Sequence, residues 1–274
     1  MDLNDETIAK RYLRECDLEK NNFELAEDLI DYTQDPLTSP VSDDEQKPYT
    51  VPVSDLARIH FIMIKRRTIN VLEFGSGRST AIMAAAMTAL YEEFYGWVNE
   101  NIRVEKPFKV FSIEEHQKFV NLTQKRLTNE TSDRVELSVS KVNLVEYDFR
   151  YCTLYEDLPN ISPDFIYLDG PSQFATGSQI NGFSISHICR MPMAPDVLKS
   201  EFFFEPGTLI LVDGRTANAR FLKYNLKRNW VYQHDPVGNV HYFELQEEPL
   251  GYLNEKKLRF CGLDYTDNDG QILL

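Results

Sequence analysis

Two hydrophobic patterns alternate along most of this chain. Short, continuous apolar runs are typical of strands buried on both faces, and longer segments with apolar residues three or four positions apart are typical of amphipathic helices. The predicted strands cover residues 69–74, 109–113, 135–139, 164–168 and 208–212, and the predicted helices cover residues 55–66, 79–97, 117–127, 195–204 and 217–228. Two further strands, 230–233 and 240–245, flank a turn at 235–239. This order predicts an α/β, Rossmann-like, doubly wound and mainly parallel sheet with an antiparallel edge strand.

The N-terminal region has a different pattern. Residues 5–32 are polar and acidic with apolar points at helical spacing, which predicts one or two helices that form an N-terminal helical cap. Residues 35–52 are rich in Pro, Ser, Thr and Asp and predict a linker or ordered loop over the site. Ser54 is the expected N-cap of the next helix. We therefore expect a cap and linker at 1–52, one α/β domain at 53–247 and a C-terminal extension at 248–274.

Charge and composition restrict the partners. The 274 residues are 42% hydrophobic, and 43 acidic against 29 basic side chains give a net charge of −14. This charge repels phosphate backbones and anionic membranes, so we expect neither nucleic acid nor a membrane as a partner. The start lacks the features of a secretion signal, and the four cysteines are scattered, which predicts a cytoplasmic protein with free thiols. The oligomeric state is left open.

The first predicted strand runs into a glycine turn. Residues 71–80 read VLEFGSGRST, so that Gly75 and Gly77 separate an apolar strand from a helix. Glycines let the backbone turn sharply and approach a ligand, and the new helix offers unpaired N–H groups. The turn therefore predicts a site for a nucleoside-bearing cofactor.

Carboxylates follow the ends of successive strands. Glu73, Glu114, Asp169 and Asp213 all fall at or just beyond the carboxyl ends of predicted strands, which is the edge where open α/β sheets bind ligands. Each residue alone could be a helix cap or turn former. Four of them at successive strand ends favour a shared site, in which an acid at position 114 suits ribose hydroxyls.

These motifs resemble those of class I S-adenosylmethionine-dependent methyltransferases. The matching segments are EFGSGRST at 73–80, SIE at 112–114, FIYLDGP at 165–171 and GTLILVD at 207–213. The nearest pattern is a bacterial group whose first motif ends in Gly-x-Ser-Thr and whose fourth strand ends in Asp-Gly-Pro. The resemblance covers roughly residues 55–245. It implies the fold and the cofactor and says almost nothing about the acceptor.

The resemblance also implies roles for individual residues. Glu114 would hold the ribose, Asp169 would border the methyl donor, and Glu73 would orient the loop or the amino group of the cofactor. The residues implied to shape the methionine end are Gly75, Gly77, Ser79 and Thr80, and Ser76 is a further cofactor-binding candidate. Two departures stand out, because Ser79 replaces the usual third glycine and Glu114 lies far from the turn, which leaves Glu115 as an alternative to Glu114.

Other kinds of protein fit the turn less well. An NAD-dependent oxidoreductase needs a third glycine three residues after the second, where this chain has Thr80, and an acid about 20 residues further on. A phosphate-binding loop needs a Gly-Lys-Ser/Thr that is absent from the turn. A non-catalytic interaction protein that binds a nucleoside remains an alternative, although Asp169 and Asp213 occupy the place where chemistry would occur.

If the protein transfers methyl groups, its residues must align the acceptor and remove a proton from a hydroxyl. The polar insert 172–192 is the expected acceptor lid, and His187 within it is the first candidate base. Asp169 and Asp213 offer a second route, with Arg215 as the partner that compensates their charges. Paired carboxylates could also hold Mg²⁺, but Gly214 replaces the further oxygen ligand typical of that branch, so we expect no metal. By elimination, the sequence predicts O-methylation of a hydroxylated small molecule or a sugar.

Overall fold

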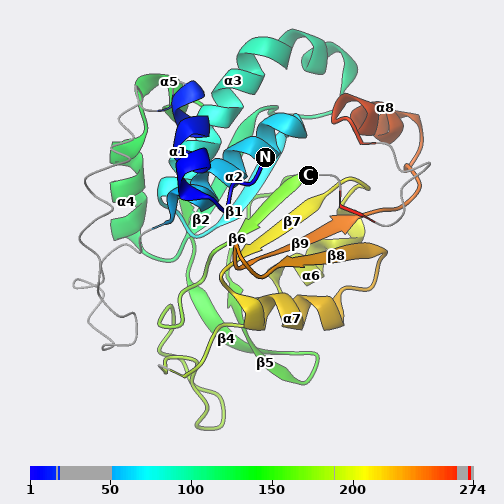
Figure 1. Ribbon diagram of the computed structural model, residues 1–274. Coiled ribbons are helices and arrows are strands. Elements are labelled where there is room, and N and C mark those ends of the chain that lie inside the picture. Colours follow the sequence, from blue (N-terminus) through cyan, green and yellow to red (C-terminus); the bar gives the residue numbers. More distant parts are fainter. Residues whose placement is uncertain (17, 19–50, 188, 264–270, 273–274) are drawn as a thin grey trace.

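The computed structural model describes residues 1–16, 18, 51–187, 189–263 and 271–272. A seven-stranded sheet crosses the molecule in the order β3-β2-β1-β6-β7-β9-β8 (Figure 1). Its first five strands are parallel, and β9 pairs antiparallel with both β7 and β8. The strands are β1 (Asn70–Phe74), β2 (Lys109–Glu114), β3 (Val135–Val139), β6 (Phe165–Leu168), β7 (Leu209–Asp213), β8 (Trp230–Asp235) and β9 (Val240–Leu245). The predicted Rossmann-like fold class is confirmed.

Strand order reverses between β1 and β6, because β2 and β3 lie on one side of β1 while β6 and β7 lie on the other. All five positions of β1 and all four of β6 are buried. Open α/β sheets bind ligands at such a switch point, beyond the carboxyl ends of the strands. The glycine turn follows β1 directly and therefore lies at this point.

The period of two along each strand divides the core between the two faces of the sheet. Val71 and Tyr167 pack on the face covered by α2 and α3, whereas Leu72 and Leu168 pack on the face covered by α6 and α7. The helices are α1 (Glu6–Glu15), α2 (Val53–Lys65), α3 (Arg78–Asn101), α4 (Gln117–Arg126), α5 (Asn129–Ser132), α6 (Asp196–Ser200), α7 (Thr216–Asn225) and α8 (Tyr252–Phe260), with a 3-10 turn η2 (Glu201–Phe203).

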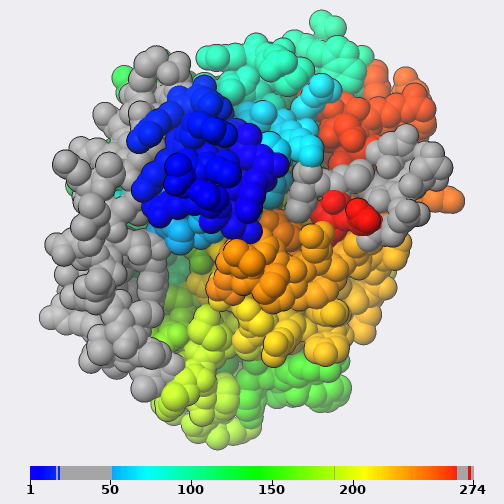
Figure 2. Space-filling view, in the orientation of Figure 1, coloured from blue at the N-terminus to red at the C-terminus, as the bar shows by residue number. Residues whose placement is uncertain are grey.

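The N-terminal cap is described only in part. Helix α1 is one of the one or two amphipathic helices predicted for residues 5–32. Most of residues 17–50 lie outside the described residues. Asn4 donates to Asp235 at 3.0 Å and accepts from Arg58 at 2.7 Å. Figure 2 shows the N-terminal residues lying against the β8–β9 region. The start of the chain is therefore fixed beside the antiparallel edge of the sheet.

The expected N-cap at Ser54 is wrong. Helix α2 begins at Val53, and Pro52 occupies the N-cap position with φ −56° and ψ 145°. Proline suits the start of a helix because the first N–H groups have no partner within the helix in any case. Ser54 lies inside the first turn instead.

Two elements have no counterpart in the prediction. A separate antiparallel hairpin is formed by β4 (Val142–Tyr147) and β5 (Arg150–Tyr155), below the main sheet in Figure 1. Helix α8 lies in the region 248–274, where the sequence indicated only an extension. None of the helices in the described ranges combines the length and the apolar character that a bilayer crossing requires.

Candidate active site

The carboxyl ends of β1, β2 and β6 surround a cavity of about 110 Å³. It brings together most of the residues that the sequence singled out. The candidates that line it are Gly75, Ser76, Gly77, Ser79, Glu114, Asp169 and Arg215, and Glu115 lines it as well. Four segments that are distant in the sequence thus meet at the switch point of the sheet.

The glycine turn forms one wall of the cavity. Gly75 has φ +90°, and a Cβ there would lie 3.2 Å from the backbone nitrogen of Gly170, so both the conformation and the space favour glycine. Gly77 differs, because its backbone is extended at φ 171° and a Cβ would meet no described protein atom within 4 Å. Gly77 therefore keeps space open inside the cavity rather than relieving strain.

Glu73 holds the beginning of α3. Its carboxylate is fully buried and accepts hydrogen bonds from the hydroxyls of Ser79 and Thr80, both at 2.6 Å. The Gly77 N–H donates to the Thr80 hydroxyl at 2.9 Å, which ties the turn to the same group. Burial raises the pKa of Glu73 to about 7, opposed by the hydrogen bonds from its hydroxyl partners. Of the two roles expected for Glu73, the geometry favours orientation of the loop.

Glu114 lines the same cavity and is hydrogen-bonded directly to the glycine turn. Its Oε2 accepts from the Ser76 N–H at 2.8 Å and from the Ser76 hydroxyl at 3.2 Å, and its Oε1 accepts from the His116 N–H at 3.1 Å. Burial, followed by the charge of Glu115, raises the pKa of Glu114 to about 8. Helix α4 has His116 as its N-cap, so Glu114 does not cap it.

Asp169 and Arg215 form a pair at the edge of the cavity. The Arg215 Nε lies 3.4 Å from Asp169 Oδ1, Nη1 donates to the Pro171 carbonyl at 2.7 Å, and Nη2 donates to the Asp169 carbonyl. The surrounding protein raises the pKa of Asp169 and the Arg215 charge opposes this rise, although 44% of the Asp169 side chain is exposed. Arg215 thus fixes the loop after β6 and leaves part of the carboxylate open to the cavity.

Asp213 lies beside this cavity and does not line it. Its Oδ2 accepts from the hydroxyl of Tyr167 at 2.6 Å. Burial raises the pKa of Asp213 to about 7, with further upward contributions from the charges of Asp55 and Asp169. The expected compensation of both carboxylates by Arg215 is therefore wrong for Asp213, whose hydrogen-bond partner is a neutral phenol and whose rise in pKa is opposed by the charge of Arg58 instead.

His187 is placed away from the cavity. Its side chain lies on an exposed stretch of the insert, where Nδ1 accepts from the Cys189 N–H at 3.1 Å. Within the described residues it lines no part of the cavity. The structure thus does not bring the first candidate base to the other site residues.

The sequence interpretation missed Tyr167, Tyr155 and Asp55. Tyr167 carries a hydroxyl within an otherwise apolar, buried strand, which is a signal that could have been found. Asp55 is buried and pairs with Arg58 at 2.6 Å, and an acid at the start of a predicted helix gives no signal of this pairing in the sequence. Tyr155 belongs to the hairpin that the sequence pattern did not predict.

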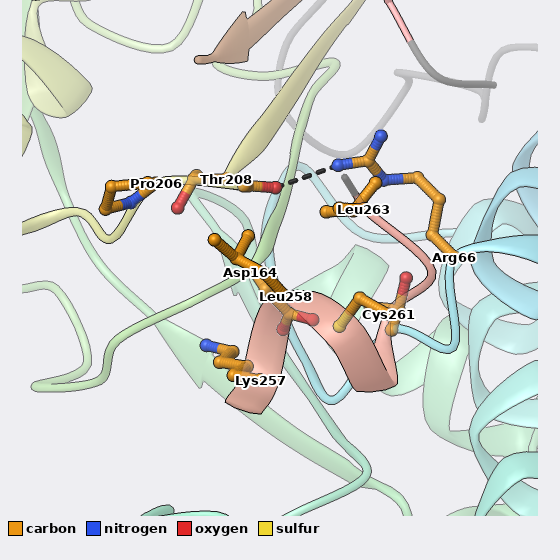
Figure 3. A pocket seen from close by; sticks show the side chains of 10 residues that line it. Arg66, Asp164, Pro206, Thr208, Lys257, Leu258, Cys261 and Leu263 are labelled. Carbon is orange, nitrogen blue, oxygen red and sulfur yellow. Dashed lines mark hydrogen bonds between the residues drawn. The ribbon is translucent and has the colours of Figure 1, made fainter. Parts of the chain in front are cut away.

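The opposite end of the sheet has an open cavity of about 990 Å³, whose lining includes Asn70, Lys106 and Glu136 but none of the residues that the sequence singled out as site candidates. A cavity of about 10 Å³ lies between α8 and the starts of β6 and β7, where Arg66 donates to the Gly207 carbonyl at 2.8 Å (Figure 3). This volume accommodates about one water molecule. Among the described residues, no group of three or more His, Cys, Asp or Glu side chains is arranged to hold a metal ion.

The chain matches no protein family model and no curated protein. Solved structures that it resembles include the SAH-bound methyltransferase PaMTH1 from Podospora anserina, with 13% identity over 73% of this chain and 80% of that one and a TM-score of 0.43. The O-methyltransferase TomG from Streptomyces achromogenes, solved with SAM, is 14% identical over 90% and 91%, with a TM-score of 0.40. An O-methyltransferase from Bacillus cereus, solved with SAH, is 13% identical over 85% and 90%, with a TM-score of 0.36.

Proposed function

We propose that this protein is an S-adenosylmethionine-dependent methyltransferase that methylates a hydroxyl of a small molecule or sugar. The observation that carries the proposal is the convergence of the Gly75–Gly77 turn, Glu114 and Asp169 on one cavity at the switch point of the sheet. These are the positions at which the motif resemblance places the cofactor. The second candidate function is nucleoside binding without catalysis, which would use the same cavity.

The residues of the cavity fit this cofactor. The open space above Gly77 provides a cradle that a Cβ would fill, as expected where a ligand approaches the backbone. The partly exposed Asp169 carboxylate suits a cationic cofactor. The enclosed 110 Å³ is smaller than usual small-molecule sites of about 300 Å³ or more, so the cofactor would extend beyond the enclosed part.

Glu114 has capacity left for the ribose. Its two carboxylate oxygens offer about four acceptor positions, of which donors among the described residues use three. The hydrogen bonds from Ser76 and His116 hold the carboxylate in place at the cavity wall. Ribose hydroxyls would then complete its shell.

The chemical step is carried by the cofactor, which supplies an activated methyl group on a sulfonium centre. The protein must hold the acceptor hydroxyl in line and accept its proton. Asp213 suits the second task, because a carboxylate with a pKa of about 7 can both take up and release a proton near neutral pH. Tyr167 donates a hydrogen bond to Oδ2 of Asp213, and Oδ1 would take the proton of the acceptor.

Replacing Glu114 by glutamine tests the cofactor assignment. The amide keeps the size of the side chain but cannot accept hydrogen bonds at both ends. At a pH above 8, where the Glu114 carboxyl has lost its proton, SAM affinity should therefore fall by about 1.5–3 kcal/mol, the range for bonds to a charged group. Isothermal titration calorimetry of the native and Glu114→Gln proteins measures the difference.

Thermal unfolding of both proteins provides the control, because Glu114 also binds Ser76 and His116. Equal SAM affinity together with a lower Tm in Glu114→Gln would assign Glu114 a structural role alone and would contradict its role at the ribose.

A further inference from the structure

The insert between β6 and α6 rests on the β4–β5 hairpin. The Leu144 N–H of β4 donates to the Ser178 hydroxyl at 3.0 Å, and the ring of Tyr151 in β5 lies 4.9 Å from the ring of Phe183. Further along, the Thr153 N–H donates to the Met193 carbonyl at 2.9 Å. The segment expected to bind the acceptor is therefore attached to the hairpin at several points along its length.

Tyr155 at the end of β5 joins this assembly to the main sheet. Its side chain is buried, and its ring lies 5.6 Å from that of Phe74 in β1. Its N–H donates to Asp196 Oδ1 at 3.1 Å, where the insert ends, and its hydroxyl donates to Glu115 Oε2 at 3.0 Å. One residue thus contacts the end of the insert, the strand before the glycine turn and a carboxylate of the cavity.

Glu115 completes the connection at the beginning of the insert. Its second oxygen, Oε1, accepts from the Ser172 N–H at 2.8 Å, and its side chain lines the cavity. The neighbouring loop has no spare room, because a Cβ on Gly170 would lie 2.7 Å from both the Tyr155 hydroxyl and the Gly75 nitrogen. A shift of either carboxylate oxygen must therefore move the loop after β6 or the hairpin.

We infer that Glu115 and Tyr155 are positioning residues that couple the occupancy of the cofactor cavity to the ordering of the acceptor insert. The inference rests on the proposed function. A ligand in the cavity restricts Glu115, which holds Ser172 with one oxygen and Tyr155 with the other, so both ends of the insert are fixed relative to the glycine turn. The acceptor is then bound against a frame that becomes more rigid when the methyl donor is present.

Hydrogen exchange of the full-length protein, with and without SAM, tests this coupling. In the native protein we expect SAM to slow exchange in peptides from residues 173–186 by about tenfold, since ordering of the insert lowers its local opening. Tyr155→Phe removes only the hydroxyl and should reduce this protection to less than about twofold while the protein still binds SAM. Tyr147→Phe is the matched control, because Tyr147 lies on the same hairpin and lines no described part of the cavity.

Two Glu115 variants distinguish positioning of the insert by Glu115 from a general effect of the substitution on protein stability. Glu115→Gln keeps the ability to bond both Ser172 and Tyr155 and should retain the protection, whereas Glu115→Ala should lose it even at SAM concentrations that saturate the variant in calorimetry. Native-like protection in Tyr155→Phe or Glu115→Ala would overturn the coupling, as would absence of SAM-dependent protection in a native protein that binds SAM. If the native protein does not bind SAM at all, both the proposed function and the coupling inferred from it fail. In that case, faster exchange of residues 173–186 in ligand-free Tyr155→Phe than in Tyr147→Phe would show that the Tyr155 hydroxyl holds the insert in place without any coupling to SAM.

Discussion

Gly77→Val is expected to fold normally and to bind SAM on the order of 100-fold more weakly than the native protein. The folded state should tolerate the substitution because the Gly77 backbone is extended and a Cβ there meets no described protein atom within 4 Å. The same open space belongs to the cavity, so the valine methyl groups would occupy the volume that the cofactor needs. Calorimetry for SAM and circular dichroism for the fold measure both expectations.

Gly96→Val provides the matched control. Gly96 lies in helix α3, which Gly77 precedes as the N-cap; it is exposed and also has no described atom within 4 Å of a Cβ, but it lies outside the cavity lining. The Gly96→Val protein should bind SAM as tightly as the native protein does. Tight binding by a folded Gly77→Val protein would mean that the glycine turn does not hold the cofactor.

Asp213→Asn is expected to lower methyl transfer by about 10²–10⁴-fold, the usual contribution of a general base. SAM affinity should change little, because Asp213 does not line the described cavity. The assay first requires an acceptor, found by screening hydroxylated aromatic compounds and sugars with SAM labelled in the methyl group. Asp133→Asn, at an exposed position remote from the site, is the control.

The pH profile shows whether Asp213 itself carries the proton. Activity should rise with pH as the Asp213 carboxyl, whose pKa is about 7, loses its proton. The Tyr167 hydrogen bond lowers the pKa of Asp213, so Tyr167→Phe should shift the acid limb of the profile to higher pH. An unshifted limb, or full activity in Asp213→Asn, would contradict the assignment. Loss of activity in EDTA that Mg²⁺ restores would refute metal-free catalysis.

The strands of the main sheet were predictable from the sequence to within one residue or two. A short continuous apolar run such as Phe165–Leu168 predicts a buried strand when glycine and acidic residues mark its end. The β4–β5 hairpin was missed because its turn contains Asp148 and Phe149, both at positive φ, and no glycine to signal it. Helix α8 was missed because its surface is largely polar and only Asn254, Leu258 and Phe260 are buried.

The candidate site was predictable where chemistry follows strand ends. Gly75, Glu114 and Asp169 needed only the strand boundaries and the rule that parallel strands end at one edge of the sheet. The partners of these residues could not be predicted, because they depend on distances across the fold. Tyr167 beside Asp213, and Tyr155 beside Glu115, are separated in the sequence by 46 and 40 residues. His187 was predicted to lie at the site because the sequence alone does not show which residues of the insert face the cavity and which face the solvent.

Calorimetric titration of the native protein with SAM, with NAD⁺ in a parallel experiment, tests the proposed function most directly. The Gly75–Gly77 turn with Glu114 and Asp169 predicts saturable binding of SAM at one site per chain and no binding of NAD⁺. Absence of SAM binding by the folded protein, or binding of NAD⁺ in its place, would contradict the assignment of this cavity to the methyl donor.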